Sequence, residues 1–476
     1  MLHTFEFLPL RAVACLFFAA LPGALAQTTE ANPSPLWEVA DAVPKGKHTS
    51  VQALVMLGGD AVVAAGCRLS QGLVAVCYDL KTGEQRWETL LPDLYFGQFG
   101  YEFLRVSPDG DVWVAGDARD YRESDALVVV RLDGSSGRQR WVARVPYSMR
   151  DGASSLAFSL GPTGDACVAY SVHGDGPSLH AVVGRVRGSD GACLWNKMVP
   201  LPGAYRPEPR GVVVTPEGDV VFSAERTPGS YGPALVLARL SGGDGQLQWA
   251  TDTADGVGGR LCDRTSVVTM ERTVAVFCLE GVGADSSPLW VRSISHRTGR
   301  EEWSMPLTWP PGKWESGHRM WADAAGDVYL TAVSATPLPL PDGWWKLPRK
   351  KMPPIEMGDK EVLVRKYQGA DGSLLWERRL PSAAWPGGES PKIEVAVGDC
   401  FGVLTLNGIS SKLQTFSCDL RLADGETIAR SARTSTEQIL RSPARVEAFA
   451  LAPDGTRIVG GYRGEFRAAG WWLSAW

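Results

Sequence analysis

Short apolar runs separated by polar turns follow one another along most of the chain. Between residues 102 and 145 they are EFLRVS, DVWVAG, ALVVVRL and RQRWVARV, each bounded by Gly, Pro, Asp or Ser. Short runs of β-branched residues that end in turn-forming residues are typical of β-strands. The pattern predicts four consecutive antiparallel strands, which make one twisted sheet.

The same pattern recurs at a constant interval. Steps of 54 residues connect Trp87, Trp141, Trp195, Trp249 and Trp303. The series begins at Trp37, and after an insertion it resumes with Trp376. In the next copy Ala429 stands in place of the tryptophan. A Gly-Asp turn lies ahead of the tryptophan at Gly59-Asp60, Gly110-Asp111, Gly164-Asp165, Gly218-Asp219 and Gly326-Asp327. PDGTRIVGG takes that position in the last copy, and Arg272 and Asp399 take it in weaker copies.

Copies of one four-stranded sheet bury their faces by stacking radially against their neighbours, which predicts an all-β fold, a β-propeller. Without an insertion of about 19 residues, the span from Trp37 to Trp476 divides into eight units of about 53 residues. WD40 units are shorter and carry Gly-His and Trp-Asp pairs, and kelch units carry a Gly-Gly doublet. Neither signature recurs at this period, so we expect an eight-bladed propeller of another type.

The two ends of the chain complete one blade. GWWLSAW at the C-terminus is a third strand without a fourth, and SPLWEVADA near the N-terminus is a fourth strand without a third. We expect residues 36–42 to pair with residues 470–475, which closes the ring and leaves no open edge. The repeated tryptophans are expected to pack between blades, beside a turn glycine of positive φ; they are Trp37, Trp87, Trp141, Trp195, Trp249, Trp303 and Trp376.

CYDLKTGEQRW, residues 77–87, resembles the repeat Ala-x-Asp-x-x-Thr-Gly-x-x-x-Trp of the quinoprotein alcohol dehydrogenase-like superfamily, the PQQ-repeat propellers. Asp79, Thr82, Gly83 and Trp87 match it, and the resemblance covers nearly the whole chain after residue 26. Eight blades are usual in that family. Basic residues stand at the family's Ala position in several copies, at Arg131, Arg185, Arg239 and Lys366, and only Asp79 and Asp133 match its Asp. The resemblance therefore implies the ring more directly than a quinone cofactor.

Catalytic members of that family hold pyrroloquinoline quinone on the ring axis, under a disulfide between adjacent cysteines, with calcium and an Asp base. This chain has no adjacent cysteine pair and no C-x-x-C-H haem motif. The resemblance is therefore nearest in kind to the non-enzymatic envelope scaffolds of the family, such as the outer-membrane-assembly propeller lipoprotein. We expect no catalytic residue and no bound cofactor, with quinone and calcium disfavoured.

Metal and triad chemistry receive little support from the histidines. After residue 26 they are His48, His173, His180, His296 and His318, without H-x-H, H-E-x-x-H or C-x-x-C spacing. SPDGD, with Asp109 and Asp111, lacks the later acidic ligands of a calcium loop and is expected to be a turn. A Ser-His-Asp triad stays open, because its members meet only in space.

The first 26 residues have the features of a secretory signal peptide. Arg11 precedes the apolar run AVACLFFAALPGALA, and Ala24-Leu25-Ala26 is a small-x-small cleavage pattern before Gln27. The run is too short to span a bilayer and no later stretch reaches 18 apolar residues. We expect a periplasmic or secreted protein without a transmembrane segment, with residues 27–476 as a single domain. Cys15 lies too early in the apolar run to indicate a lipid anchor.

Composition narrows the class of partner. The chain is 44% apolar with a formal net charge of -5, and no predicted strand carries a stripe of Lys and Arg, which argues against nucleic acid. Two hypotheses remain. One is a non-catalytic binding or scaffold propeller of the cell envelope, a monomer that binds a protein, a peptide or carbohydrate. The other is a quinone-dependent dehydrogenase, or another ligand-binding enzyme, that uses the axial funnel.

Eight cysteines remain after the signal, and export permits disulfides. Facing residues of a hairpin are equidistant from its turn, which pairs Cys67 with Cys77 about Gly72, Cys262 with Cys278 about Met270, and Cys400 with Cys418 about Ile409. Cys167 and Cys193 fall on strands separated by a third, so we expect them to stay reduced. The alternative is that all six are buried small hydrophobic residues.

One insertion, ATPLPLPDGWWKLPRKKMPPIEMG at residues 335–358, interrupts the sixth unit between its second and third strands. In a propeller this loop emerges on the same face as the loops between blades. Tryptophans outside the repeat and basic residues should gather there: Trp309, Lys313, Trp314, Trp344, Trp345, Arg349, Lys350, Lys351 and Trp385. Such a surface suits an extended peptide, an acidic partner or a sugar face. The alternative is a local cap, in which Trp344 and Trp345 are buried against their own blade.

Overall fold

The fold is described from a computed structural model of the chain. The structure describes residues 36–40, 49–68, 72–92, 94–95, 103–118, 126–146, 153–173, 179–201, 207–226, 234–252, 260–261, 267–269, 273–277, 279–280, 289–307, 314–322, 326–337, 357–381, 392–398, 403–409, 415–421, 423, 425, 427–433, 444–452, 456–463 and 470–475. All secondary structure in this part of the chain is β-strand, and it contains no helix that could span a membrane.

The described strands form seven sheets of four strands, one of five and one of two. The first sheet contains β2 (Thr49–Leu57), β3 (Ala61–Arg68), β4 (Gly72–Asp79) and β5 (Gln85–Leu91). The second contains β6 (Leu94–Tyr95), β7 (Leu104–Val106), β8 (Val112–Ala118), β9 (Ala126–Leu132) and β10 (Gln139–Pro146). The third contains β11 (Ala153–Leu160), β12 (Ala166–His173), β13 (Leu179–Val186) and β14 (Cys193–Val199). The fourth contains β15 (Pro207–Val214), β16 (Val220–Arg226), β17 (Ala234–Leu240) and β18 (Leu247–Asp252).

The later sheets follow the same order. The fifth contains β20 (Val267–Thr269), β21 (Thr273–Phe277), β23 (Leu289–Ile294) and β24 (Glu301–Leu307), and β19 (Arg260–Leu261) pairs separately with β22 (Leu279–Glu280). The sixth contains β25 (Trp314–Ala322), β26 (Val328–Pro337), β27 (Met357–Tyr367) and β28 (Leu374–Pro381). The seventh contains β29 (Lys392–Gly398), β30 (Val403–Ile409), β31 (Thr415–Arg421) and β32 (Thr427–Arg433). The eighth contains β33 (Ala444–Leu451), β34 (Arg457–Arg463), β35 (Gly470–Ala475) and β1 (Trp37–Ala40).

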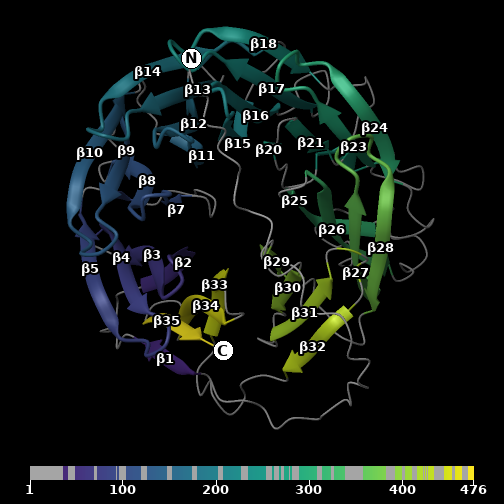
Figure 1. The fold of residues 1–476 in the computed structure, drawn as a ribbon. Helices are drawn as coiled ribbons and strands as arrows, with labels where there is room; N and C mark the ends of the chain where they lie inside the picture. The colour runs from purple at the N-terminus through teal and green to yellow at the C-terminus, as the bar shows by residue number, and fades with distance from the viewer. Residues whose placement is uncertain are drawn as a thin grey trace, which may run out of the picture. The chain divides into compact units, whose positions relative to one another are not determined.

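Strands within a sheet lie side by side in chain order and pair antiparallel (Figure 1). The four strands predicted between residues 102 and 145 are β7 to β10, and the short strand β6 adds to β8. The eighth sheet has the predicted exception: its order is β1-β35-β34-β33, with Trp37 opposite Ala475 and Ala40 opposite Trp472. The pairing expected between the two ends of the chain is therefore confirmed.

The second strand of the first, second and third sheets is buried on both of its faces. Val62–Ala65 of β3, Val112–Ala115 of β8 and Ala166–Tyr170 of β12 have essentially no exposed surface. A strand in a sheet that is covered on both sides has no solvent face, so its sequence lacks an apolar–polar alternation. This burial explains why the strands are continuous apolar runs rather than alternating ones.

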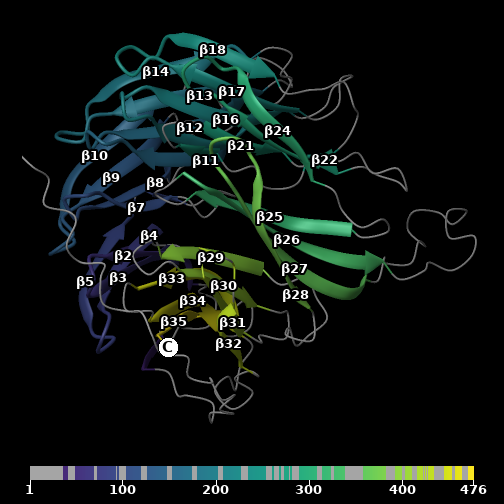
Figure 2. The same cartoon turned by 45° about the vertical axis from the view of Figure 1, so that its right-hand side comes forward.

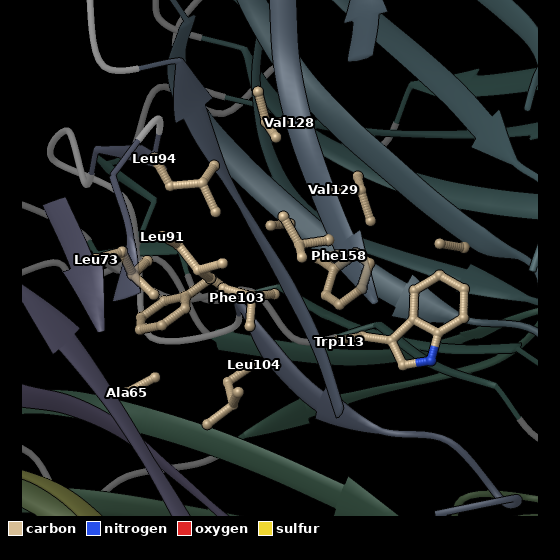
Figure 3. Close-up of a cluster of buried hydrophobic side chains, with 14 of the residues drawn as sticks. Ala65, Leu73, Leu91, Leu94, Phe103, Leu104, Trp113, Val128, Val129 and Phe158 are labelled. Atoms are coloured by element: carbon tan, nitrogen blue, oxygen red, sulfur yellow. The ribbon is translucent and has the colours of Figure 1, made fainter. Parts of the chain in front are cut away.

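The hydrophobic core extends from one sheet into the next. Figure 3 shows part of it, where Leu73 of β4 and Leu91 of β5 lie near Phe103, which immediately precedes β7. The first strand of most sheets contacts the first strand of the next, β11 of the third sheet contacts β8 of the second, and β2 of the first sheet contacts β33 of the eighth. Three hydrophobic clusters join the eighth, first, second, third and fourth sheets, so these sheets bury faces against one another, as the repeat requires.

Candidate functional site

The repeated tryptophans bind the next sheet through a turn glycine and a backbone carbonyl. Trp87 Nε1 donates to the Gly134 carbonyl at 2.8 Å, and a Cβ built at Gly137 would lie 2.6 Å from the Trp87 ring. Gly137 also has a φ of 68°, which L side chains rarely adopt. The same ring-on-glycine contact joins Trp37 to Gly83, Trp141 to Gly191, Trp195 to Gly245, Trp249 to Gly299, Trp303 to Gly372 and Trp376 to Gly425. We call the contact region between two neighbouring sheets around such a tryptophan and glycine a joint. The predicted packing role of these tryptophans is confirmed.

The basic residues at the family's Ala position belong to the joints. Arg185 forms an ion pair with Asp165 of its own sheet at 2.9 Å, and its Nη1 donates to the carbonyls of Gly218 and Gly242 at 2.9 and 2.7 Å. The Gly242 carbonyl also accepts the Trp195 indole N–H at 2.9 Å. Arg and Trp of one sheet thus converge on one carbonyl of the next sheet.

This arrangement recurs in other sheets, with the acid always taken from the Gly-Asp turn. The pairs are Arg131 with Asp111 at 2.6 Å, Arg239 with Asp219 at 2.5 Å, and Lys366 with Asp327 at 3.0 Å. Sequence reasoning treated these basic residues only as departures from a family repeat. The signal that could have assigned them was their fixed distance of 20 residues from the Gly-Asp aspartate, which lengthens to 39 in the sheet with the insertion.

SPDGD is the turn that the sequence predicts. Asp109 and Asp111 both bind Arg131, and the Gly110 amide donates to the Ser107 carbonyl. The Ser107 hydroxyl and the Arg131 guanidinium hold the pKa of Asp109 below its ordinary value. Both carboxylates are therefore used within the sheet.

The residues described do not fit a calcium–quinone centre. Within the described ranges, no group of three His, Cys, Asp or Glu side chains is arranged to hold a metal ion. The aspartates of the Gly-Asp turns at 111, 165, 219 and 327 are occupied by arginine or lysine. We accordingly derive no reaction step through such a group.

Three segments attach to the same end of the sixth sheet, and they contain Trp309, Trp344, Trp345 and Trp385 of the predicted binding surface. The register pairs Trp314 with Ala335, Pro337 with Met357, and Glu361 with Pro381. The segments 308–313, 338–356 and 382–391 therefore all attach at this end, as predicted; Figure 2 shows the four strands side by side. The insertion starts later than expected, because residues 335–337 and 357–358 belong to the extended hairpin of β26 and β27.

Most predicted partner-binding residues lie outside the described residues. These are Trp309, Lys313, Trp344, Trp345, Arg349, Lys350, Lys351 and Trp385. Trp314 is the first residue of β25 and is placed by its backbone. Charge at this end of the sheet includes Arg379, which pairs with Glu361 at 3.5 Å and with Glu377 at 2.8 Å. At the opposite end of β28, Leu374 and Leu375 are 49% and 46% exposed.

The predicted disulfide between Cys67 and Cys77 is wrong, and both cysteines are free. Cys67 lies opposite Leu73 and Cys77 lies opposite Val63, so the hairpin is centred on residue 70 and not on Gly72. Gly72 instead begins β4. Cys418 lies opposite Leu406, which centres its hairpin on residue 412 rather than Ile409. Cys400 lies outside the described residues, so the Cys400–Cys418 pair stays a prediction.

The third predicted pair, Cys262 and Cys278, also lies outside the described residues. The neighbouring pair Leu261 and Leu279 is centred on residue 270, the centre used in that prediction. Cys167 on β12 and Cys193 on β14 are separated by β13, as predicted, and both are free thiols. Burial raises the pKa of Cys167 to about 12.

Comparison with solved structures decides the fold. Quinohemoprotein alcohol dehydrogenase ADHIIG from Pseudomonas putida HK5 is 10% identical, with a TM-score of 0.51 over 93% of this chain and 75% of the enzyme. The chain has a β-propeller fold. A europium-containing methanol dehydrogenase has a TM-score of 0.50 at 10% identity, over 92% of this chain and 85% of that chain. The C-terminal WD40 domain of Sif2 has a TM-score of 0.51 at 9% identity, over 92% and 99%.

The quinoprotein neighbours agree with the family resemblance of the repeat, and identities near 10% extend that agreement to the fold alone. BamB from Moraxella catarrhalis is 12% identical, with a TM-score of 0.44 over 92% of this chain and all of BamB. No protein-family model and no curated protein matches the chain.

Proposed function

We propose that the chain is an exported, eight-bladed, PQQ-like propeller that acts as a non-catalytic binding protein of the cell envelope. Its first 26 residues are the export signal, and residues 27–476 are one domain. The contacts between successive sheets, which include β8 with β11 and β33 with β2, support a closed ring. The β1–β35 pairing supports closure by the two ends of the chain.

The register of the sixth sheet is the observation that carries the binding role. It attaches to one end of one sheet the segments that contain Trp309, Trp344, Trp345 and Trp385 and the cluster Arg349, Lys350 and Lys351. None of these tryptophans stands at the repeat position that the joint tryptophans occupy, so the repeat does not account for them. Aromatic and arginine side chains are enriched among the residues that dominate binding energy. The proposed partner is a protein or an extended peptide, with an acidic or carbohydrate surface as the alternative, and the propeller binds it as a monomer.

The repeat itself supports a structural use of its polar residues. The acids of the Gly-Asp turns and the basic residues of the third strands satisfy one another at the joints. Charged groups that are paired in this way stabilise the contacts between sheets, and we assign them no catalytic role. No cofactor is part of this proposal.

The test is capture of the partner by variants that differ only at the proposed surface. Wild type, Trp344→Ala/Trp345→Ala and Leu374→Ala/Leu375→Ala would be immobilised and exposed to extract of the protein's own envelope. Loss of Trp344 and Trp345 should weaken binding by more than about 1 kcal/mol with little change in Tm. The leucine variant removes exposed apolar surface at the opposite end of the sheet and should bind normally.

Two outcomes would contradict the proposal. The tryptophan variant could lose Tm and keep its binding, which would make the insertion a local cap. The purified wild type could also show the absorbance of a bound quinone and oxidise an alcohol, which would favour the dehydrogenase.

A further inference from the structure

His296 has a buried and unsatisfied side chain. It is 2% exposed, and neither ring nitrogen has a hydrogen-bond partner among the described residues. A charged group is close: the Glu217 Oε2 atom lies 3.6 Å from Nε2, too far for a hydrogen bond. A buried imidazole normally satisfies at least one nitrogen, so this ring requires an explanation.

The repeat shows that His296 replaces a glycine. The same position is Gly134, Gly188, Gly242 and Gly369 in other sheets, where its carbonyl accepts the joint tryptophan. A Cβ at Gly242 would lie 2.0 Å from the Gly218 carbonyl oxygen, so the usual residue has no side chain. His296 therefore introduces a titratable ring at a point where most joints have none.

The position lies at the joint between the fourth and fifth sheets. The His296 carbonyl accepts from Arg239 Nη1 at 2.6 Å and from Trp249 Nε1 at 3.2 Å. A hydrogen bond from a charged guanidinium is stronger than one between neutral groups. Any movement of the residue that carries this carbonyl weakens both contacts together.

The charges around the ring do not favour a second positive charge. From the fourth sheet, Glu217 and Arg239 face it, and Arg239 is itself paired with Asp219; from the fifth sheet, Arg297 and Glu302 face it. Burial is the main factor that lowers the pKa of His296 below its usual 6.5, and Arg239 and Arg297 add to it. Glu217 and Glu302 oppose this effect without cancelling it.

We propose that His296 makes the joint between the fourth and fifth sheets acid-sensitive. When the ring takes up a proton, it gains a charge that the buried joint solvates poorly, and the joint opens so that the ring reaches water. The unfolded or opened chain binds this proton more tightly than the closed joint. Stability of the joint is therefore complete above about pH 6.5 and falls as the pH decreases toward the lower pKa of the closed state.

The experiment compares two matched turns of the same protein by hydrogen–deuterium exchange. In residues 295–300 the Gly299 amide donates to the Ser295 carbonyl, and in residues 241–246 the Gly245 amide donates to the Ser241 carbonyl. The second turn belongs to the preceding joint, which has Gly242 in place of His296. After correction for intrinsic exchange, a shift from about pH 7.5 to about pH 5.5 should raise exchange several-fold in the first turn and leave the second unchanged.

Variants at the same position complete the test. His296→Leu and His296→Gly should abolish the difference between the turns, and Glu217→Gln should enlarge it, because Glu217 supports the charged ring. His180→Leu, which changes a histidine on β13, should behave as wild type. An equal acid response of both turns in wild type would overturn the proposal, and so would persistence of the difference in His296→Leu or His296→Gly.

Discussion

Gly191 and Gly164 belong to the third sheet and have nearly the same backbone conformation, with φ of 76° and 78°. Their surroundings differ. A Cβ at Gly191 would lie 2.7 Å from the Trp141 ring, whereas one at Gly164 would have no atom within 4 Å. The pair therefore separates the conformational requirement for glycine from the requirement for space at a joint.

We predict that Gly164→Ala costs about 1–2 kcal/mol of unfolding free energy, the cost of the left-handed conformation alone. Gly191→Ala should cost at least about 1 kcal/mol more, because Trp141 must move. Urea denaturation of both variants measures the difference. Equal losses would show that the ring does not depend on a glycine at this position.

Arg185 offers a second test of a joint. Arg185→Met removes the charged partner of the partly buried Asp165 carboxylate and one donor from each of the Gly218 and Gly242 carbonyls, and should cost about 3 kcal/mol. Arg187→Met breaks the exposed pair with Asp190 and should cost less than about 1 kcal/mol. Thermal and urea unfolding of the two variants decide between a structural and a neutral role for the buried arginine.

The strands were predictable because their spacing repeats, and the joints were predictable only in part. Trp87 and Gly83 can be recognised because they recur in the repeat. The role of Arg185 depends on the Gly242 carbonyl, 57 residues away, which no local pattern reveals. His296 was included among the histidines without a role, although its glycine counterparts at 188 and 242 were visible in the repeat.

Hairpin centres were the weakest inference. The wrong disulfide between Cys67 and Cys77 follows from a turn centre misplaced by two residues, and the hairpin of Cys418 is centred three residues from the expected position. A strand end depends on where pairing stops, and a glycine such as Gly72 can begin a strand as well as form a turn. The insertion of the sixth sheet was correctly located, but its strands extend to Pro337 and from Met357.

The disulfide between Cys262 and Cys278 is a prediction at the scale of one hairpin. Peptide mapping of the unreduced protein should recover Cys262 and Cys278 as a linked pair. Cys77 and Cys167 should react with iodoacetamide only after unfolding, because burial raises the pKa of each thiol to about 12 and removes the reactive thiolate. Alkylation of both Cys262 and Cys278 in the denatured, unreduced chain would exclude the bridge.

At the scale of the whole molecule, the N-terminal strand β1 contacts both the last sheet and the first. Trp37 of β1 donates to the Leu80 carbonyl at 2.6 Å, and its ring lies on Gly83, so the N-terminal strand supplies a joint to the first sheet while it pairs with β35. Contacts made by one strand to both the last and the first sheet support the closed ring that we propose.

Trp37→Ala should therefore destabilise the protein by about 3–5 kcal/mol, as expected for a buried tryptophan. Its neighbour Leu36 is 64% exposed, and Leu36→Ala should be nearly neutral. Similar melting temperatures for the two variants would mean that Trp37 does not stabilise the contact between the N-terminal strand and the first sheet.

We propose above that the end of the sixth sheet that carries the insertion binds a partner in the envelope. A photo-crosslinking amino acid placed at position 344, and in a second protein at position 374, tests this binding in living cells. We expect one reproducible crosslinked partner from position 344 and none from position 374, at the opposite end of the sheet. The same products from both positions, or none from position 344, would contradict it.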